Sequence, residues 1–350
     1  MQCLRRLFTL GGLLVTLMAL TGCGPPPPYK EQAYVFGTLV EVSIHGEPPQ
    51  RARQAAAAVL REFDRMHRRL HAWQADSELE RLNAAFARGA RPVPVAPDLA
   101  AVLRDAAEWS RRSGGLFNPA IGNLVRLWGF HADTYAARLP PAAAIERLVA
   151  AAPRMDDLVF GPGTVASRNP AVRIDLGGYA KGLALDRAAA ILRAAGIRNA
   201  LVNIGGNVIA LGSKGGRPWR VGIQHPRRAG ALATLDLHDG EAIGTSGDYQ
   251  RYFELAGRRY CHLIDPRNGW PVQGVQAVTV LAAGPRAGVV SDVASKPLFI
   301  AGPAAWRAMA ARLGVSHALL IDAQGRVGLT APLARRLRWE GPPPPPLPDG

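Results

Sequence analysis

The residues best suited to bind an anion lie where a predicted strand gives way to a predicted helix. Asp175 ends the strand, the glycine pair Gly177-Gly178 follows, and the helix opens with Lys181 in its first turn. Free backbone N–H groups at a helix start, together with one cation, suit a phosphate group. The spacing matches neither the Walker A motif nor the G-x-G-x-x-G dinucleotide pattern. A purely structural glycine turn therefore explains this stretch equally well.

Two further glycine-rich stretches follow strand ends later in the chain. The first is Gly205-Gly206, and the second is Ser246-Gly247, which precedes His262 and the turn that begins at Asp265. A carboxylate three residues from a histidine can orient the imidazole so that it acts as a general base. A hydrogen-bonded pair with a structural role is the alternative interpretation of His262 and Asp265.

The hydrophobic pattern predicts the elements that must position these residues. Amphipathic spacing predicts helices, and alternation with β-branched residues predicts strands. The pair Ser77 and Glu80 has the pattern of a capping box at a helix start. The mixture predicts an α+β fold in two lobes, with mixed or antiparallel sheets packed against helices. The predicted helices are 51–70, 98–112, 181–195, 289–301 and 303–313, and the predicted strands are 33–44 (broken at Gly37), 201–211, 219–224, 242–245, 249–256, 275–281 and 318–322.

The start of the chain has the pattern of a bacterial export signal. Arg5 and Arg6 precede an apolar run of about 14 residues, which is short of the roughly 20 needed to cross a bilayer. The run ends in Leu20-Thr21-Gly22-Cys23, which resembles a lipobox whose cysteine thiol is diacylated. A plain signal peptide or a single membrane anchor is the alternative.

These features predict the domain organisation and the location of the protein. We expect a signal peptide over residues 1–22, a lipidated cysteine with a proline-rich tether over 23–30, a globular domain over 31–335, and a disordered proline-rich tail over 336–350. The mature protein is expected to be anchored by lipid to a bacterial membrane and to face the periplasm. The sequence leaves open whether that is the inner or the outer membrane.

Composition narrows the classes of partner. The chain carries 42 Lys and Arg against 27 Asp and Glu, a formal net charge of +15. The arginines are scattered and not interleaved with aromatic residues, which favours a solvated basic face and argues against nucleic acid. We expect this positive charge to attract anionic lipid headgroups or an anionic cofactor. With Cys3 removed and Cys23 acylated, Cys261 is the remaining thiol, so a disulfide framework is excluded.

Taken in order, these pieces resemble the FAD:protein FMN transferases, the family of the thiamine-biosynthesis lipoprotein ApbE. The resemblance spans nearly the whole mature chain, and the lipobox agrees with the usual location of the family. Each motif is modest evidence alone, but their common order is strong evidence. The matching pieces are Gly37-Thr38, Ser77-Glu78-Leu79 with Asn83, residues 115–119, residues 127–130, residues 175–182, Gly205-Gly206, Ser246-Gly247, residues 262–269 and residues 292–302.

The resemblance implies a flavin transferase with an ApbE-like fold. Such an enzyme binds FAD, uses magnesium to polarise its diphosphate, and passes the FMN half to a Thr or Ser hydroxyl of an extracytoplasmic redox protein with release of AMP. By motif, His262 is the candidate base, and Gly178, Asp292 and Lys296 fall at the magnesium position. The residues implied to bind FAD are Phe36, Trp73, Leu116, Phe117, Asn118, Asp175, Lys181 and Ile264, although most of the apolar ones are equally consistent with ordinary core.

The chain departs from the family pattern at the expected metal site. Family members usually carry threonine four residues after the aspartate, and here that residue is Lys296, on the same helical face as Asp292. Either Lys296 neutralises the diphosphate itself, or Ser295 supplies the missing hydroxyl, or the protein binds FAD without transferring FMN. Asn118 and Asn207 also stand where the family commonly has aspartate.

These features leave three functions to consider. The first is an FMN transferase that matures a membrane redox protein. The alternative is a non-catalytic FAD-binding lipoprotein that assists assembly of a respiratory complex, and the third is a basic interaction protein without a small ligand. The order of the motifs favours the first two, and activity against a threonine-bearing acceptor separates them.

Overall fold

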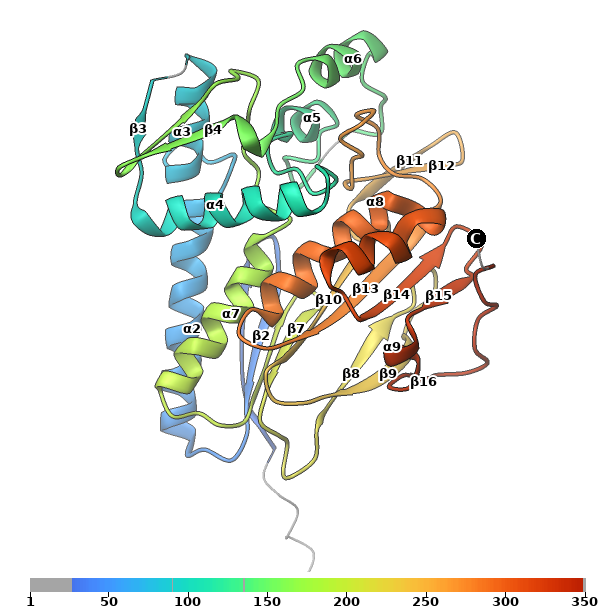
Figure 1. Cartoon of the computed structure of the whole chain (residues 1–350). Coiled ribbons are helices and arrows are strands. Elements are labelled where there is room, and N and C mark those ends of the chain that lie inside the picture. The colour runs from blue at the N-terminus through green and yellow to red at the C-terminus, as the bar shows by residue number, and fades with distance from the viewer. Residues whose placement is uncertain (1–26, 90, 135, 349–350) are drawn as a thin grey trace, which may run out of the picture.

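A computed structural model describes residues 27–348 except residues 90 and 135 (Figure 1). The predicted signal peptide and the predicted lipidation site at Cys23 lie outside the described residues. Among the described residues, no helix combines the length and the hydropathy that a membrane span requires.

An eight-stranded sheet forms the centre of the molecule. Its strands run in the order β1-β2-β6-β7-β10-β13-β14-β15, and each pair of neighbours is antiparallel. The predicted strand over 33–44 is a hairpin, because Phe36 and Gly37 adopt positive φ and turn the chain back on itself. The strands are β1 (Tyr29–Val35), β2 (Thr38–Ile44), β6 (Ala200–Ile204), β7 (Asn207–Leu211), β10 (Glu241–Gly247), β13 (Val275–Ala283), β14 (His317–Asp322) and β15 (Val327–Leu329).

Three long helices cover one face of this sheet: α2 (Pro49–Leu70), α7 (Ala180–Ala194) and α8 (Ala287–Leu313) (Figure 1). The α2 helix buries a stripe that includes Ala52, Ala56 and Phe63, the spacing that the sequence pattern predicts. The opposite face is covered by a small sheet of β8 (Trp219–Gln224), β9 (Ala231–Leu237) and β16 (Arg338–Trp339), whose side chains share a core with β7, β10, β13 and β14. The molecule is therefore built in three layers.

A second group of elements lies at one end of the main sheet. Its helices are α3 (Glu78–Ala87), α4 (Pro97–Arg112), α5 (Gly122–Leu127), α6 (Ala142–Ala150) and the 3₁₀ turn Met155–Asp157. Its strands are β3 (Val93–Pro94), β4 (Leu158–Gly161) and β5 (Thr164–Ser167), with the hairpin β11 (Tyr252–Leu255) and β12 (Arg258–Cys261) beside them (Figure 1). The α+β prediction of antiparallel sheets packed with helices is confirmed.

Only one of the two hydrogen bonds of the predicted capping box forms at Ser77. Ser77 Oγ accepts a hydrogen bond from the Glu80 backbone N–H at 2.9 Å, as an N-cap should. The Glu80 carboxylate does not reach back to the cap, because it pairs with Arg173 at 2.5 Å. A long-range ion pair has replaced the second bond of the capping box.

The end of the chain differs from the prediction of a disordered tail. The short helix α9 (Ala331–Ala334) leads into β16, which pairs with β9, and the Leu347 backbone N–H donates to the Val327 carbonyl at 2.9 Å. Proline cannot donate a backbone hydrogen bond, but its carbonyl still accepts one, and Pro345 accepts from the Val327 N–H at 2.8 Å. Residues 336–348 are therefore packed on the edge of the sheet.

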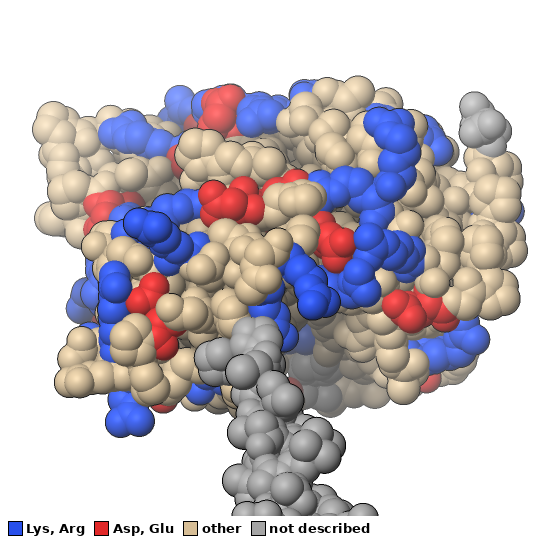
Figure 2. Space-filling view, turned by 90° about the horizontal axis from the view of Figure 1, so that it is seen from below, with Lys and Arg blue, Asp and Glu red and all other residues tan. Residues whose placement is uncertain are grey.

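Charge on the face from which β1 emerges is dispersed. Figure 2 shows this face from below, with basic side chains scattered among acidic and neutral ones. At the start of α2, Arg51 forms an ion pair with Glu47 at 3.1 Å. The basic side chains seen on this face are dispersed and do not form one continuous patch.

Candidate active site

One cavity of about 450 Å³ brings most of the predicted site residues together. It opens where the β1–β2 turn, the start of α7, the end of β10 and the middle of α8 meet the second group of elements. Ten predicted residues line it, namely Phe36, Leu116, Phe117, Asn118, Asp175, Gly178, Lys181, His262, Ile264 and Lys296. An apolar wall with a few converging polar groups is the usual form of a cofactor site.

Trp73 lies in a smaller adjoining cavity of about 150 Å³. Asp175 and Lys181 line both cavities. The Trp73 indole Nε1 donates to Asp175 Oδ2 at 3.3 Å, while the Gly177 N–H donates to Asp175 Oδ1 at 2.7 Å. Asp175 therefore holds the glycine turn and the indole in place, at the boundary between the two cavities.

Two helices fix the position of Lys181 by capping one another. Asp292 of α8 accepts from the Gly182 N–H in the first turn of α7 at 2.7 Å, and Asp186 of α7 accepts from the Gly288 and Val289 N–H groups of α8 at 2.8 and 3.0 Å. A carboxylate near a helix N-terminus satisfies orphan donors and the helix dipole. Burial nevertheless raises the pKa of Asp186 to about 6.

The crossing of these helices requires glycine. A Cβ at Gly182 would lie 2.5 Å from the Gly288 carbonyl oxygen and 2.7 Å from Asp292 Cβ, and a Cβ at Gly288 would lie 2.4 Å from the Gly182 carbonyl oxygen. The two backbones thus approach closely. This contact brings Asp292 and Lys296 of α8 up to the first turn of α7.

Lys296 forms an ion pair with Asp292. Its Nζ donates to Asp292 Oδ1 at 2.6 Å and to the Asp292 carbonyl oxygen at 2.7 Å. The Lys296 side chain is 14% exposed and that of Asp292 is 2% exposed, so the carboxylate is buried behind the ammonium. Asp292 does not itself line the cavity; Lys296 and Gly178 do.

These residues do not offer an open set of magnesium ligands. Each carboxylate oxygen of Asp292 already accepts a hydrogen bond, Oδ2 from the Gly182 N–H and Oδ1 from the Lys296 ammonium. Ser295 is buried and its hydroxyl bonds to the Asp292 carbonyl at 2.7 Å and to Ser246 Oγ at 2.7 Å, so it does not supply the expected hydroxyl. In the described part of the chain, no group of three His, Cys, Asp or Glu side chains is placed to hold a metal.

His262 is held in one tautomer. Its Nδ1 lies 3.2 Å from the Arg251 carbonyl oxygen, which can only accept, so Nδ1 carries the proton and Nε2 keeps its lone pair. Burial, together with the nearby positive charges of Arg251, Lys181 and Lys296, lowers the pKa of His262 to about 3. The imidazole is therefore neutral at pH 7, in the form that accepts a proton.

The predicted pairing of His262 with Asp265 is absent. Asp265 binds its own turn, accepting from the Arg267 backbone N–H at 2.9 Å and from the Arg267 guanidinium at 2.7 Å. The carbonyl of Arg251 orients His262 instead. Proximity in sequence was misleading because the turn satisfies the carboxylate locally.

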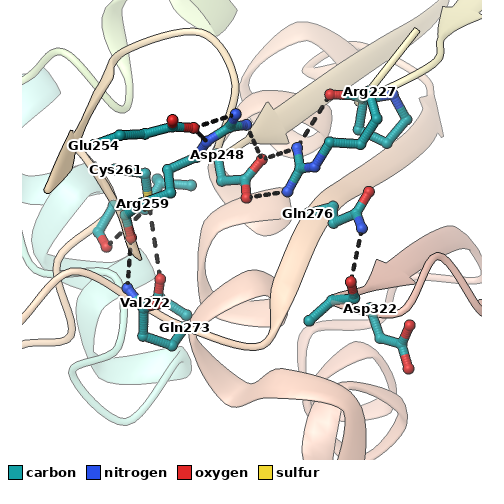
Figure 3. Close-up of polar contacts among 12 residues, drawn as sticks. Arg227, Asp248, Glu254, Arg259, Cys261, Val272, Gln273, Gln276 and Asp322 are labelled. Carbon is teal, nitrogen blue, oxygen red and sulfur yellow. Dashed lines mark hydrogen bonds and ion pairs between the residues drawn. The ribbon is translucent and has the colours of Figure 1, made fainter. Parts of the chain in front are cut away.

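The β11–β12 hairpin, which leads to His262, is anchored by a group of ion pairs between side chains (Figure 3). Asp248, just after Ser246-Gly247, accepts two hydrogen bonds from Arg227 at 2.7 and 2.6 Å, and Arg259 of β12 lies 3.6 Å away. Arg259 also pairs with Glu254 of β11 at 2.8 Å. Burial raises the pKa of the adjacent Cys261 thiol to about 12, which makes this cysteine unreactive at neutral pH.

Arg251 is the main site residue that the sequence did not reveal. It lines the cavity, and its guanidinium donates to the carbonyls of Phe130 at 2.6 Å and Ala132 at 3.0 Å. It stands in a turn within the predicted strand 249–256, of which only Tyr252–Leu255 is strand. Arg251 joins Lys181 and Lys296 as a third cation of the cavity. Burial lowers the pKa of Lys181. Within the described residues, Lys181 forms no ion pair.

The asparagines at positions of expected aspartate have structural roles. Asn118 Nδ2 donates to the Pro153 carbonyl at 2.9 Å, and its Oδ1 accepts from the Ala120 N–H at 3.1 Å. Asn207 is buried, and its Oδ1 accepts from the Thr245 N–H at 3.2 Å. Asn118 still forms part of the cavity wall, whereas Asn207 does not line the cavity.

The fold builds a cavity with an apolar wall, three basic side chains and a neutral histidine. Comparison with known proteins gives the family. A model of the ApbE family matches residues 36–320, and the chain belongs to this family of flavin transferases. The crystal structure of the ApbE protein of Thermotoga maritima matches with a TM-score of 0.81 at 29% identity, covering 89% of this chain and 99% of that one. The flavin transferase ApbE from Vibrio cholerae matches with a TM-score of 0.77 at 25% identity, covering 89% of this chain and 100% of that one.

Two relatives of similar sequence are named FAD:protein FMN transferases. An FAD:protein FMN transferase of Rhodobacter capsulatus is 45% identical over 338 residues, which is 95% of this chain and 64% of the relative. The chain thus spans less than two thirds of that relative's length. An FAD:protein FMN transferase of Treponema pallidum is 33% identical over 351 residues, covering 94% of this chain and 95% of the relative. The family resemblance expected from the motifs is confirmed.

Proposed function

We propose that this chain is an FAD:protein FMN transferase, which moves FMN from FAD to a Thr or Ser hydroxyl of an extracytoplasmic redox protein and releases AMP. The observation that carries the proposal is the convergence of Lys181, Arg251 and Lys296 on one cavity with the neutral His262. The cations suit a diphosphate, and the apolar wall suits the flavin.

The proposed reaction is a phosphoryl-type displacement. The acceptor hydroxyl oxygen forms a bond to the FMN phosphorus, the bond from that phosphorus to the bridging oxygen breaks, and AMP leaves with the bridging oxygen. His262 Nε2 takes the hydroxyl proton. Lys181 and Arg251 stabilise the negative charge that gathers on the phosphoryl oxygens and on the leaving phosphate.

The family resemblance also implies magnesium. When bound, such an ion polarises the diphosphate. Because Asp292 and Lys296 satisfy one another in this chain, the proposed reaction assigns no step to a metal ion.

The expected lipid anchor is compatible with the position of the cavity. The β1 strand begins at Tyr29 and ends at Val35, next to Phe36 in the cavity wall. Seven residues of strand span about 23 Å at the usual rise of 3.3 Å per residue. We propose that a lipidated Cys23 and its proline-rich tether hold the protein at a membrane with the cavity turned toward periplasmic partners.

Transfer to a defined acceptor tests the proposed function. The full chain, purified in detergent, is incubated with FAD and a protein that carries an accessible threonine in a flavin-acceptor segment. We expect acid-stable flavin fluorescence on the acceptor band and about one AMP released per flavin attached, as the bond count of the displacement requires.

The control acceptor has its threonine replaced by alanine and should remain unlabelled. FAD that binds tightly without any AMP release would contradict the transferase and would support the non-catalytic FAD-binding lipoprotein. The use of an acceptor with serine in place of threonine shows whether both hydroxyls are accepted.

A further inference from the structure

The Lys296 side chain contacts Asp292 and Gly178, the two other residues that the family resemblance assigns to a metal site. Its Nζ is 2.6 Å from Asp292 Oδ1, and a Cβ added at Gly178 would lie 2.9 Å from Lys296 Cε. The lysine side chain therefore passes between the buried carboxylate and the glycine turn. Both of these neighbours belong to the predicted metal position.

We propose that the Lys296 ammonium is a built-in cation that replaces the divalent metal at this position, so that the chain binds the diphosphate of FAD without a metal ion there. The proposal rests on the proposed function only in taking FAD as the ligand. It makes Lys296 a ligand-binding residue and gives Asp292 the role of holding it.

The donors and acceptors support this replacement. A lysine ammonium has three N–H donors, and Lys296 uses one on Asp292 Oδ1 and one on the Asp292 carbonyl. One donor is left for a ligand on the side where Lys296 lines the cavity. A magnesium ion would need oxygen ligands at about 2.0–2.1 Å in octahedral geometry, whereas Asp292 Oδ2 already accepts from the Gly182 N–H and a positive ammonium already stands 2.6 Å from Oδ1.

The net charge of the cavity also favours a diphosphate. Lys181, Arg251 and Lys296 give three positive charges, and Asp175 and Asp292 give two negative ones, which leaves a net charge of +1 before a ligand binds. An anionic diphosphate would be attracted to this wall rather than repelled. The charge of Lys296 is balanced by Asp292, so its contribution is a fixed N–H donor next to the other two cations.

Lysine is rare in this chain, yet it occurs at the cavity. The sequence has lysine only at Lys30, Lys181, Lys214 and Lys296, while arginine carries most of its positive charge. Two of these four lysines line the cavity. A lysine ammonium is a compact point charge, closer in shape to a metal ion than the planar guanidinium of arginine.

Manganese binding to the protein without FAD tests the replacement directly. Mn²⁺ prefers the same oxygen ligands as Mg²⁺ and its free ion is counted by electron paramagnetic resonance. We expect the wild-type full chain to bind no Mn²⁺ at this site. The Lys296→Thr variant, which restores a hydroxyl beside Asp292, should bind about one Mn²⁺ per chain. The control Lys214→Thr removes an exposed lysine outside the cavity and should behave as wild type.

FAD affinity provides the second readout. The dissociation constant of FAD for the wild type should agree within about twofold in Mg²⁺ and in EDTA, because the ammonium is always present. The Lys296→Thr variant should bind FAD at least about tenfold more tightly in Mg²⁺ than in EDTA, since its diphosphate contact then depends on a metal. The Lys296→Met variant should bind about tenfold more weakly than wild type in both conditions, because it has neither an ammonium nor a hydroxyl.

Three results would overturn the inference. They are stoichiometric Mn²⁺ binding by the wild type, FAD binding by the wild type that is tenfold tighter with Mg²⁺, and a folded Lys296→Thr variant that binds no Mn²⁺. Circular dichroism confirms that each variant is folded. If FAD binds without metal but AMP is never released, the proposed function fails and this inference stands. If transfer occurs and FAD binding requires Mg²⁺, the inference fails and the function stands.

Discussion

Replacing His262 by alanine is expected to lower the rate of FMN transfer by about 10²- to 10⁴-fold, the usual contribution of a general base. The reason is geometric. The Arg251 carbonyl fixes the proton on Nδ1, which leaves Nε2 unprotonated beside a cavity that contains Lys181 and Lys296. Without the imidazole, the acceptor hydroxyl must lose its proton to water.

Separate measurements of binding and transfer check this expectation. Single-turnover release of AMP reports the transfer step, and calorimetry reports FAD affinity, which should change by less than about threefold because His262 is neutral in the free protein. His238→Ala, an exposed histidine after β9, is the matched control and should leave transfer unchanged. Transfer by His262→Ala at more than a third of the wild-type rate would show that His262 is not the base.

The pH profile gives an independent readout of the same residue. A histidine of ordinary pKa, 6.5, would lose about tenfold in its neutral fraction between pH 8 and pH 5.5. The pKa of His262 in the free protein is about 3, lowered by burial and by Arg251, Lys181 and Lys296. Because kcat/KM reports the free enzyme, we expect it to stay flat between pH 8 and pH 5.5. A tenfold fall over this range that disappears in His262→Ala would contradict the lowered pKa.

Replacing Asp292 by asparagine is expected to lower the free energy of unfolding by about 3 kcal/mol, because it leaves a largely buried ammonium without its counter-charge. Asp292 is 2% exposed and Lys296 is 14% exposed, so water compensates the loss poorly. Urea unfolding followed by circular dichroism measures the change. The amide oxygen of asparagine can still accept from the Gly182 N–H, so the cap of α7 is retained.

A double variant separates the effect of the unpaired charge on stability from the effect of changed packing. Asp292→Asn combined with Lys296→Met removes both charges while keeping the volumes similar, and we expect it to be within about 1 kcal/mol of the wild type. A cost of less than 1 kcal/mol for Asp292→Asn alone would mean that Lys296 finds another partner. In that case the pair would not hold the ammonium at the cavity wall.

Local patterns in the sequence predicted many of the elements. The glycine pair before Lys181, the cap at Ser77 and the amphipathic stripe of α2 are set by residues within a few positions of one another. The break between the two predicted helices at 289–313 also appears, because Gly302 adopts φ 73° and ψ 178° inside α8 and Pro303 follows it. Such features depend on backbone conformation and short-range bonds.

Features that depend on long-range contacts could not be predicted in this way. Arg251 enters the cavity because its guanidinium is held by carbonyls about 120 positions earlier in the chain, at Phe130 and Ala132. The ordered end of the chain depends on the exposed edges of β9 and β15, which the proline composition does not reveal. The position of Lys296 over Gly178 likewise depends on the close crossing of α7 and α8 at Gly182.

Calorimetric titration of FAD into the full chain, alongside the variant Lys181→Met, decides whether the cavity is a dinucleotide site. We expect saturable heat with about one FAD bound per chain, and affinity about tenfold weaker in the variant, which loses a charged contact to the diphosphate. Absence of heat with the wild type, or equal affinity in both proteins, would contradict the assignment of the cation-lined cavity to FAD.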